Sequence, residues 1–61
     1  MDRKSQFVRT YSNLPLGLRE EIVVVINNKP LTWNAAYIEV ENETDKGKEI
    51  LGKLVEFGIL K

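Results

Sequence analysis

The chain has 61 residues, and its nine basic and nine acidic side chains leave no formal net charge at pH 7. Cysteine and histidine are absent, which excludes disulfides, thiol chemistry and the usual zinc sites. A chain of this length holds a single small domain, residues 1–61, and its longest apolar run, Ile22 to Ile26, is far shorter than the ~20 residues of a membrane-spanning helix.

The N-terminal third of the chain carries the weakest structural signals. We expect residues 1–5 to form a flexible tail without the apolar stretch of a signal peptide, so the protein is predicted to be cytoplasmic. Aromatic and β-branched side chains favour a strand over 6–11. Apolar and polar residues alternate only incompletely there, so the sequence does not decide whether this segment is a strand. Ser12 or Asn13 can cap a short helix near 14–20.

A β-hairpin follows. Five consecutive β-branched residues favour a strand over 21–26, which we expect to be the central strand of a sheet. Asn27 and Asn28 tolerate positive φ and therefore predict a two-residue turn. The returning strand over 29–32 contains Pro30, which has no N–H to donate and belongs at a sheet edge.

Two helices complete the chain. Thr32 is positioned to cap a helix over 33–42, in which apolar residues recur with helical spacing. The alternation of apolar and polar residues within 36–41 leaves a strand as the alternative for that part. Thr44 is a second cap candidate, for a helix over 45–57 with one apolar stripe.

Glycines mark the end and the interior of this last helix. Gly58 ends it, and Ile59 is expected to pack back onto its final turn. Gly47 and Gly52 lie inside the helix, where each costs about 1 kcal/mol relative to alanine. Of the two, Gly52 is the candidate for close approach by another backbone, with a tolerated defect as the alternative.

These elements predict an α+β fold, in which a small antiparallel sheet of two or three strands is covered by the two C-terminal helices. The residues expected to form the intrachain core lie on the sheet and on one stripe of each helix. They are Ile22, Val24, Ile26, Trp33, Tyr37, Val40, Ile50, Leu51, Leu54, Val55 and Phe57.

The strand over 21–26 is apolar on both faces, and the two helices of so short a chain can cover only one. Successive strand residues point to opposite faces, so Val23 and Val25 need another cover. Either the segments 7–11 and 14–18 fold over them, or a second copy of the chain does. We expect a twofold homodimer. Its predicted self-association residues are Leu16, Leu18, Val23 and Val25.

Catalytic and metal-binding patterns are missing from the sequence. No histidine is present to activate the serine and threonine hydroxyls, a lysine could act as the base only if it were buried beside them, and the adjacent Glu20 and Glu21 diverge. The carboxylates at every second position from Glu39 to Asp45 do not match a calcium loop and cannot converge from one helix. The sequence therefore predicts no catalytic, cofactor-binding or metal-binding residue, no cofactor, and a protein that is not an enzyme.

Nucleic acid is the alternative partner. Two helices with a short break between them, followed by a glycine stop, resemble part of a winged-helix module. Acidic residues share the second helix with its lysines and disfavour phosphate binding, so this alternative ranks below self-association. Its contact residues would be Arg3, Lys4, Arg9, Lys46, Lys48 and Lys53.

Four segments carry a resemblance to small uncharacterised prokaryotic proteins of archaeal type. They are Leu-Pro-Leu at 14–16, Val-Val-Val-Ile-Asn-Asn at 23–28, Thr-Trp-Asn at 32–34 and Lys-Leu-Val-Glu-Phe-Gly-Ile-Leu at 53–60. The resemblance implies a family of unknown function and assigns no functional residue. The sequence alone thus predicts a non-enzymatic homodimeric protein-interaction or scaffold module. An unidentified protein is a further partner, and a winged-helix-like nucleic-acid-binding domain is the alternative function.

Overall fold

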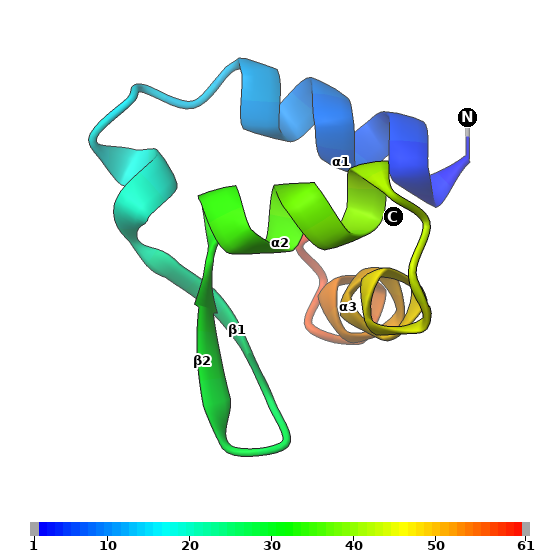
Figure 1. The fold of residues 1–61 in the computed structure, drawn as a ribbon. Coiled ribbons are helices and arrows are strands. Elements are labelled where there is room, and N and C mark those ends of the chain that lie inside the picture. The colour runs from blue at the N-terminus through cyan, green and yellow to red at the C-terminus, as the bar shows by residue number, and fades with distance from the viewer. Residues whose placement is uncertain (1, 61) are drawn as a thin grey trace.

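The computed structural model describes residues 2–60 (Figure 1). The two strands form one antiparallel sheet, and helices pack against one side of it, so the predicted α+β class is confirmed. The elements follow in the order α1 (Arg3–Ser12), the single 3-10 turn η1 (Leu18–Glu20), β1 (Ile22–Ile26), β2 (Lys29–Thr32), α2 (Trp33–Glu41) and α3 (Asp45–Glu56).

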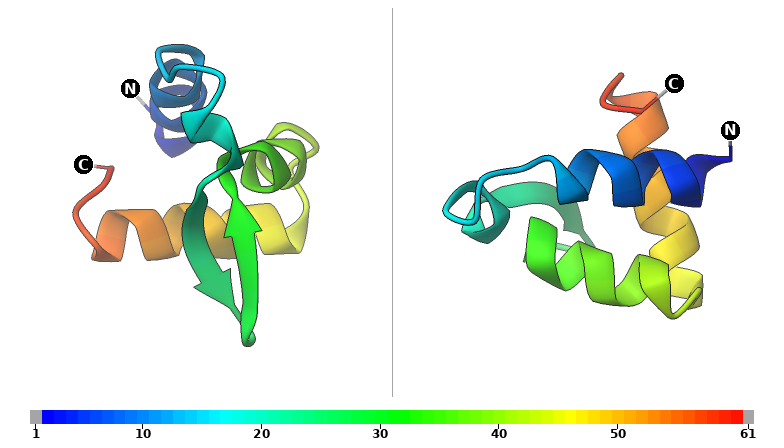
Figure 2. Two further views of the ribbon diagram at one scale, coloured as in Figure 1. Left: turned by 90° about the vertical axis from the view of Figure 1, so that its left-hand side faces the viewer. Right: turned by 90° about the horizontal axis from the view of Figure 1, so that it is seen from above.

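The helices gather on one side of the hairpin and leave its other side open. α1 and α2 lie side by side, and α3 crosses beneath them (Figure 2). β1 and β2 extend away from α1 and α2, with α3 beside them (Figure 1). The core lies where the three helices meet one face of the hairpin. The buried core residues are Phe7, Val24, Ile26, Ala36, Val40, Ile50, Leu54 and Leu60.

Residues 3–12 form helix α1, so the strand predicted over 6–11 is wrong. Asp2 caps the helix, because its carboxylate accepts the Ser5 N–H with an N to O distance of 2.7 Å. The expected tail is therefore structured from Asp2 onward, and Met1 lies outside the described residues. Phe7 is completely buried, and burial of this helix face outweighs the strand propensity of its residues.

The short helix predicted near 14–20 is reduced to the single 3-10 turn Leu18–Glu20. Arg19 within it ties this segment to the end of α1. Its Nε donates to the Tyr11 carbonyl at 3.2 Å, and a terminal nitrogen donates to the Ser12 carbonyl at 3.3 Å. Carbonyls at the end of a helix have no partner within it, so Arg19 satisfies groups that α1 leaves free.

The hairpin is confirmed, with its turn at the expected place. Asn27 and Asn28 have φ of 52° and 66°, which is the type I′ geometry that matches strand twist. The sheet has only two strands, so β1 is an edge strand and not the predicted central strand. The pairing register shifts between Ile22 and Val24, which makes Val23 an inserted β-bulge residue.

The bulge changes which β1 side chains face the core. Val24 and Ile26 are each 3% exposed, as predicted for core residues, and Val23 also packs partly against the core. Ile22, predicted as a core residue, is 59% exposed. Because strict alternation holds only without a bulge, the sequence pattern could not place Ile22 and Val23.

Both C-terminal helices and both predicted caps are confirmed. The Thr32 hydroxyl oxygen accepts the Ala35 N–H at 3.1 Å, and that of Thr44 accepts the Gly47 N–H at 2.9 Å. The region 36–41 belongs to α2, which excludes the strand alternative. These hydroxyls satisfy backbone donors that the first turn of a helix leaves free.

α3 ends in the predicted glycine stop, but the residue that packs back onto the helix is Leu60 and not Ile59. Gly58 has φ of 80°, and the Ile59 N–H donates to the Leu54 carbonyl at 2.9 Å, which is a Schellman motif. Ile59 is nevertheless 43% exposed, and Leu60 is the residue that is buried. Phe57, predicted as a core residue, is 59% exposed.

Gly47, not Gly52, permits the close approach of another backbone. A Cβ built on Gly47 would lie 2.8 Å from the carbonyl carbon of Glu39 in α2, nearer than two such atoms can come. A Cβ built on Gly52 would meet nothing within 4 Å. The prediction that another backbone approaches Gly52 closely is therefore wrong. The alternative, that Gly52 is a tolerated defect in the helix, agrees with the structure.

Candidate interaction surface

The hairpin face that points away from α3 is apolar and uncovered. Val25 pairs with Pro30 and Ile22 pairs with Thr32 across the two strands. Directly opposite residues share one face of a sheet, so Val25, Pro30 and Ile22 lie together. Ile22 is 59% and Val25 54% exposed, and no helix lies in front of this face (Figure 2, left).

The segment that leads into β1 also exposes apolar side chains. Leu16 is 76% and Leu18 48% exposed. The η1 turn lies at the upper end of the hairpin, on the side of the molecule that faces the viewer in Figure 2, left. We call Leu16, Leu18, Ile22 and Val25 together the outer apolar surface.

Three of the four predicted self-association residues lie in the outer apolar surface, namely Leu16, Leu18 and Val25. The fourth, Val23, is partly buried against the core of its own chain. Ile22 takes its place, and sequence reasoning missed it because no sequence signal marks the bulge. The structure thus leaves apolar side chains exposed both on β1 and on the segment 16–18 that precedes it.

The aromatic residues are used inside the molecule. Phe7 stacks on Trp33 with ring centroids 5.7 Å apart, and Tyr11 stacks on Tyr37 at 4.3 Å. The Arg19 guanidinium lies 4.5 Å from the centroid of Tyr11. These contacts join α1, η1 and α2 through stacking and a cation–π interaction, so the rings stabilise the fold instead of forming an open platform.

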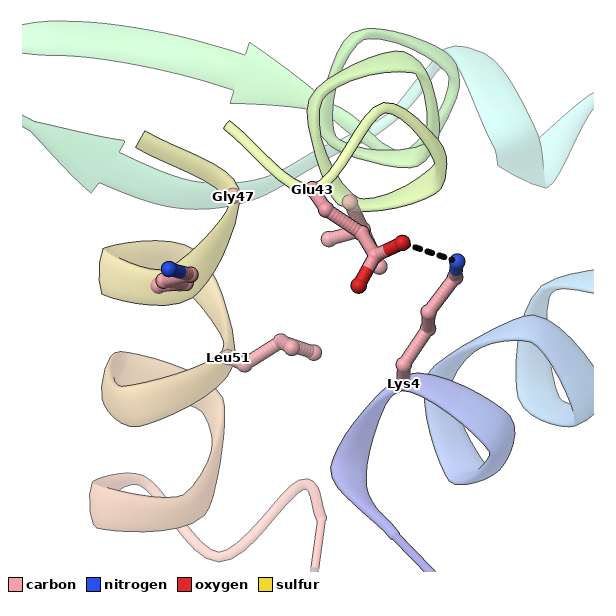
Figure 3. Close-up of a pocket in the computed structure, with 6 residues that line it drawn as sticks. Lys4, Glu43, Gly47 and Leu51 are labelled. Atoms are coloured by element: carbon pink, nitrogen blue, oxygen red, sulfur yellow. Dashed lines mark ion pairs between the residues drawn. The ribbon is translucent and has the colours of Figure 1, made fainter. Parts of the chain in front are cut away.

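The six basic residues considered for nucleic acid divide between α1 and α3. Arg3, Lys4 and Arg9 lie on α1, and the remaining three lie on α3. Lys4 Nζ is 3.4 Å from a carboxylate oxygen of Glu43 (Figure 3). One of the three α1 cations is therefore partly neutralised by an acid of the same chain.

The lysines of α3 are interleaved with acids. Lys46 and Lys53 occupy the same stripe as Glu49 and Glu56, because residues three, four or seven apart lie on one side of a helix. Lys53 Nζ also lies 4.0 Å from a Glu56 oxygen, and Lys48 falls on a different side. α3 consequently has no uniformly basic face for a phosphate backbone.

The pocket in Figure 3 is a small hollow between α1, the end of α2 and the start of α3. Its volume is about 70 Å³, well below the ~300 Å³ of the smallest typical ligand sites. Leu51 points into it, and the ion pair between Lys4 and Glu43 lies at its side (Figure 3). The hollow suits a water molecule better than an organic ligand.

Among residues 2–60, no cluster of three or more acidic side chains is arranged to hold a metal ion. No helix within the same residues combines the length and apolar character needed to cross a bilayer.

No protein family, curated protein or solved structure matches the chain. This agrees with the resemblance to small uncharacterised proteins, and the archaeal character of that resemblance stays a prediction. No residue role can be carried over from a relative, so the surface itself must support the functional argument.

Proposed function

We propose that the chain is a non-enzymatic protein-interaction or scaffold module that acts as a homodimer, joined through the outer apolar surface. One observation carries the proposal: Ile22 and Val25 each leave more than half of their surface exposed on the hairpin face that no helix covers, and Leu16, in the segment before β1, is 76% exposed. Large groups of exposed apolar residues are rare on monomeric proteins, and where they occur they usually mark an interaction site.

Self-association is favoured by the size of the chain. A domain of 61 residues without disulfides folds with little free energy to spare, and a partner subunit is one of the few remaining sources of stability. A twofold dimer requires only one self-complementary surface and is the commonest oligomer. An interface of ordinary size would bury about 800 Å² on each chain, including the outer apolar surface.

Nucleic-acid binding, the alternative from the sequence, is not proposed. The mixed charges of α3 and the ion pair at Lys4 weaken the electrostatic attraction on which phosphate binding depends.

Sedimentation equilibrium at tens of micromolar tests the proposal. The wild-type chain should show twice the mass of 7.0 kDa, and Val25→Asp should show one chain with an unchanged far-UV spectrum. Ile38→Asp is the matched control, because Ile38 is 58% exposed on α2, outside the outer apolar surface. It should remain a dimer. A wild-type protein that sediments only as a single chain would refute the proposal.

A further inference from the structure

We infer, on the basis of the proposed homodimer, that Arg19 is a positioning residue for the interface, because its guanidinium fixes the segment 15–18. This segment carries Leu16 and Leu18, two of the four residues of the outer apolar surface. It runs from the end of α1 toward β1 along one side of the molecule (Figure 1). Arg19 holds this part of the surface in one conformation before the second copy of the chain binds.

Packing does not fix this segment. Among residues 15–20, Arg19 alone is half-buried, and all the others are exposed. The η1 turn lies near α2 but buries no residue there. A segment with so few buried contacts opens and moves easily unless another interaction restrains it.

The backbone hydrogen bonds of the segment are local. Those of residues 15–20 join positions three apart, as in the Leu18 N–H, which donates to the Pro15 carbonyl at 3.0 Å. Such bonds shape the turn but do not attach it to the rest of the molecule. Within residues 2–60, the Arg19 side chain is the only group of this segment that donates hydrogen bonds to another element, namely to two carbonyls at the end of α1.

The anchor that Arg19 reaches is itself held by several contacts. The guanidinium lies 4.5 Å from the centroid of the Tyr11 ring, and that ring stacks on Tyr37 of α2 at 4.3 Å. The Tyr11 hydroxyl also donates to the side-chain oxygen of Asn34 in α2. A planar guanidinium stacks on a ring and donates in fixed directions at the same time, which a lysine ammonium cannot do. Arg19 therefore attaches the exposed segment to the contact between α1 and α2.

This attachment lowers the cost of association. A mobile segment must become ordered when a partner binds, and the conformational entropy that it loses weakens the affinity. With Arg19 in place, the segment is ordered beforehand, and Leu16 contacts a partner chain without that loss. We expect the restraint to change the dissociation constant of the dimer by about tenfold.

A double-mutant cycle tests whether Arg19 acts through the segment. Sedimentation would give the dissociation constants of the wild type, Arg19→Ala, Leu16→Ala and the combined variant, at a temperature at which the far-UV spectrum shows each to be folded. Arg19→Ala should raise the constant about tenfold, and Leu16→Ala should raise it several-fold. In the combined variant, the loss of Leu16 should add little, because the segment that carries it is no longer held in place.

Two variants separate positioning from stability and from charge. Tyr11→Phe removes the hydrogen bond to Asn34 but keeps the ring and the carbonyl that Arg19 contacts. It should lower the free energy of unfolding and leave the dissociation constant unchanged. Arg19→Lys keeps the charge without the planar fork, so it should weaken the dimer nearly as much as Arg19→Ala. Wild-type affinity of the lysine variant would contradict the proposed contacts.

Backbone order measured by NMR tests the restraint without the dimer. In the Val25→Asp chain, the further change Arg19→Ala should reduce the order parameters of residues 16–18 from ~0.85 to below ~0.6 and leave those of α1 unchanged. Unchanged order parameters at 16–18 would overturn the inference.

Each further result has a definite meaning. Effects of Arg19→Ala and Leu16→Ala that multiply in the combined variant would overturn the inference and leave the proposed dimer intact. Loss of the far-UV spectrum in Arg19→Ala would assign Arg19 to the fold as a whole and would overturn the inference as well. A single-chain mass for the wild-type protein would overturn the dimer and the inference together.

Discussion

Gly47 lies where the backbone of α3 passes closest to α2, and a Cβ there would collide with the Glu39 carbonyl group. Gly47→Ala should lower the free energy of unfolding by about 1–3 kcal/mol, because two packed helices must separate. Gly52→Ala should raise it by up to about 1 kcal/mol, because space is free and alanine favours the helix. Urea unfolding of both variants measures the contrast. Changes of the same sign would contradict the assigned roles of the two glycines.

The Asp2 cap makes α1 sensitive to acid. The hydrogen bond from the Ser5 backbone N–H, helped by the Ser5 side chain, lowers the pKa of Asp2 from its ordinary value of 3.8. A depressed pKa means that the carboxylate stabilises the folded state above the ordinary value and loses this effect as pH falls through the folded-state pKa.

Asp2→Asn should therefore reduce the acid sensitivity of the protein. Asparagine also caps helices, but its hydrogen bond does not depend on protonation in this range. Thermal unfolding followed from pH 7 to pH 2 should show a smaller loss of Tm for the variant than for the wild type, with the difference appearing below about pH 4. Parallel curves would show that Asp2 is not the responsible carboxylate.

At the level of elements, the conformation of the two turn residues limits the stability of the hairpin. Both turn residues have positive φ, which asparagine tolerates and glycine adopts without cost. Asn28→Gly should increase the free energy of unfolding by about 0.5–1 kcal/mol, and Asn28→Ala should decrease it by about 1 kcal/mol. Chemical denaturation with the dimer mass checked in parallel gives the measurement. A destabilising glycine would mean that the side chain of Asn28 makes a contact the turn requires.

The contrast between α1 and α3 explains why one helix was predicted and the other was not. α3 has a cap, a single apolar stripe and a glycine stop, so its local signals all agree. α1 contains aromatic and β-branched residues that favour a strand in isolation. It becomes a helix because Phe7 and Tyr11, one turn apart, pack together against Trp33 and Tyr37, which belong to a later part of the chain.

For the whole molecule, stability and association should be linked. If only the folded chain dimerises, Tm must rise with protein concentration. We expect this rise for the wild type and none for Val25→Asp. Val24→Asp should instead unfold the protein at every concentration, because Val24 is 3% exposed and the new charge would be buried without a partner. Differential scanning calorimetry over a hundredfold range of concentration, on the order of 1–100 μM, would show the three patterns. A wild-type Tm independent of concentration would contradict the dimer.

The sequence by itself determined the hairpin turn, the two C-terminal helices, both threonine caps and the glycine stop of α3, because each depends on residues within a few positions of one another. Only the tertiary structure decided that residues 6–11 are helical, that Gly47 is the contact glycine, and that Ile22 faces outward while Val23 packs inward. Those outcomes depend on packing between distant segments and on one bulge in strand pairing, neither of which leaves a local pattern in the sequence.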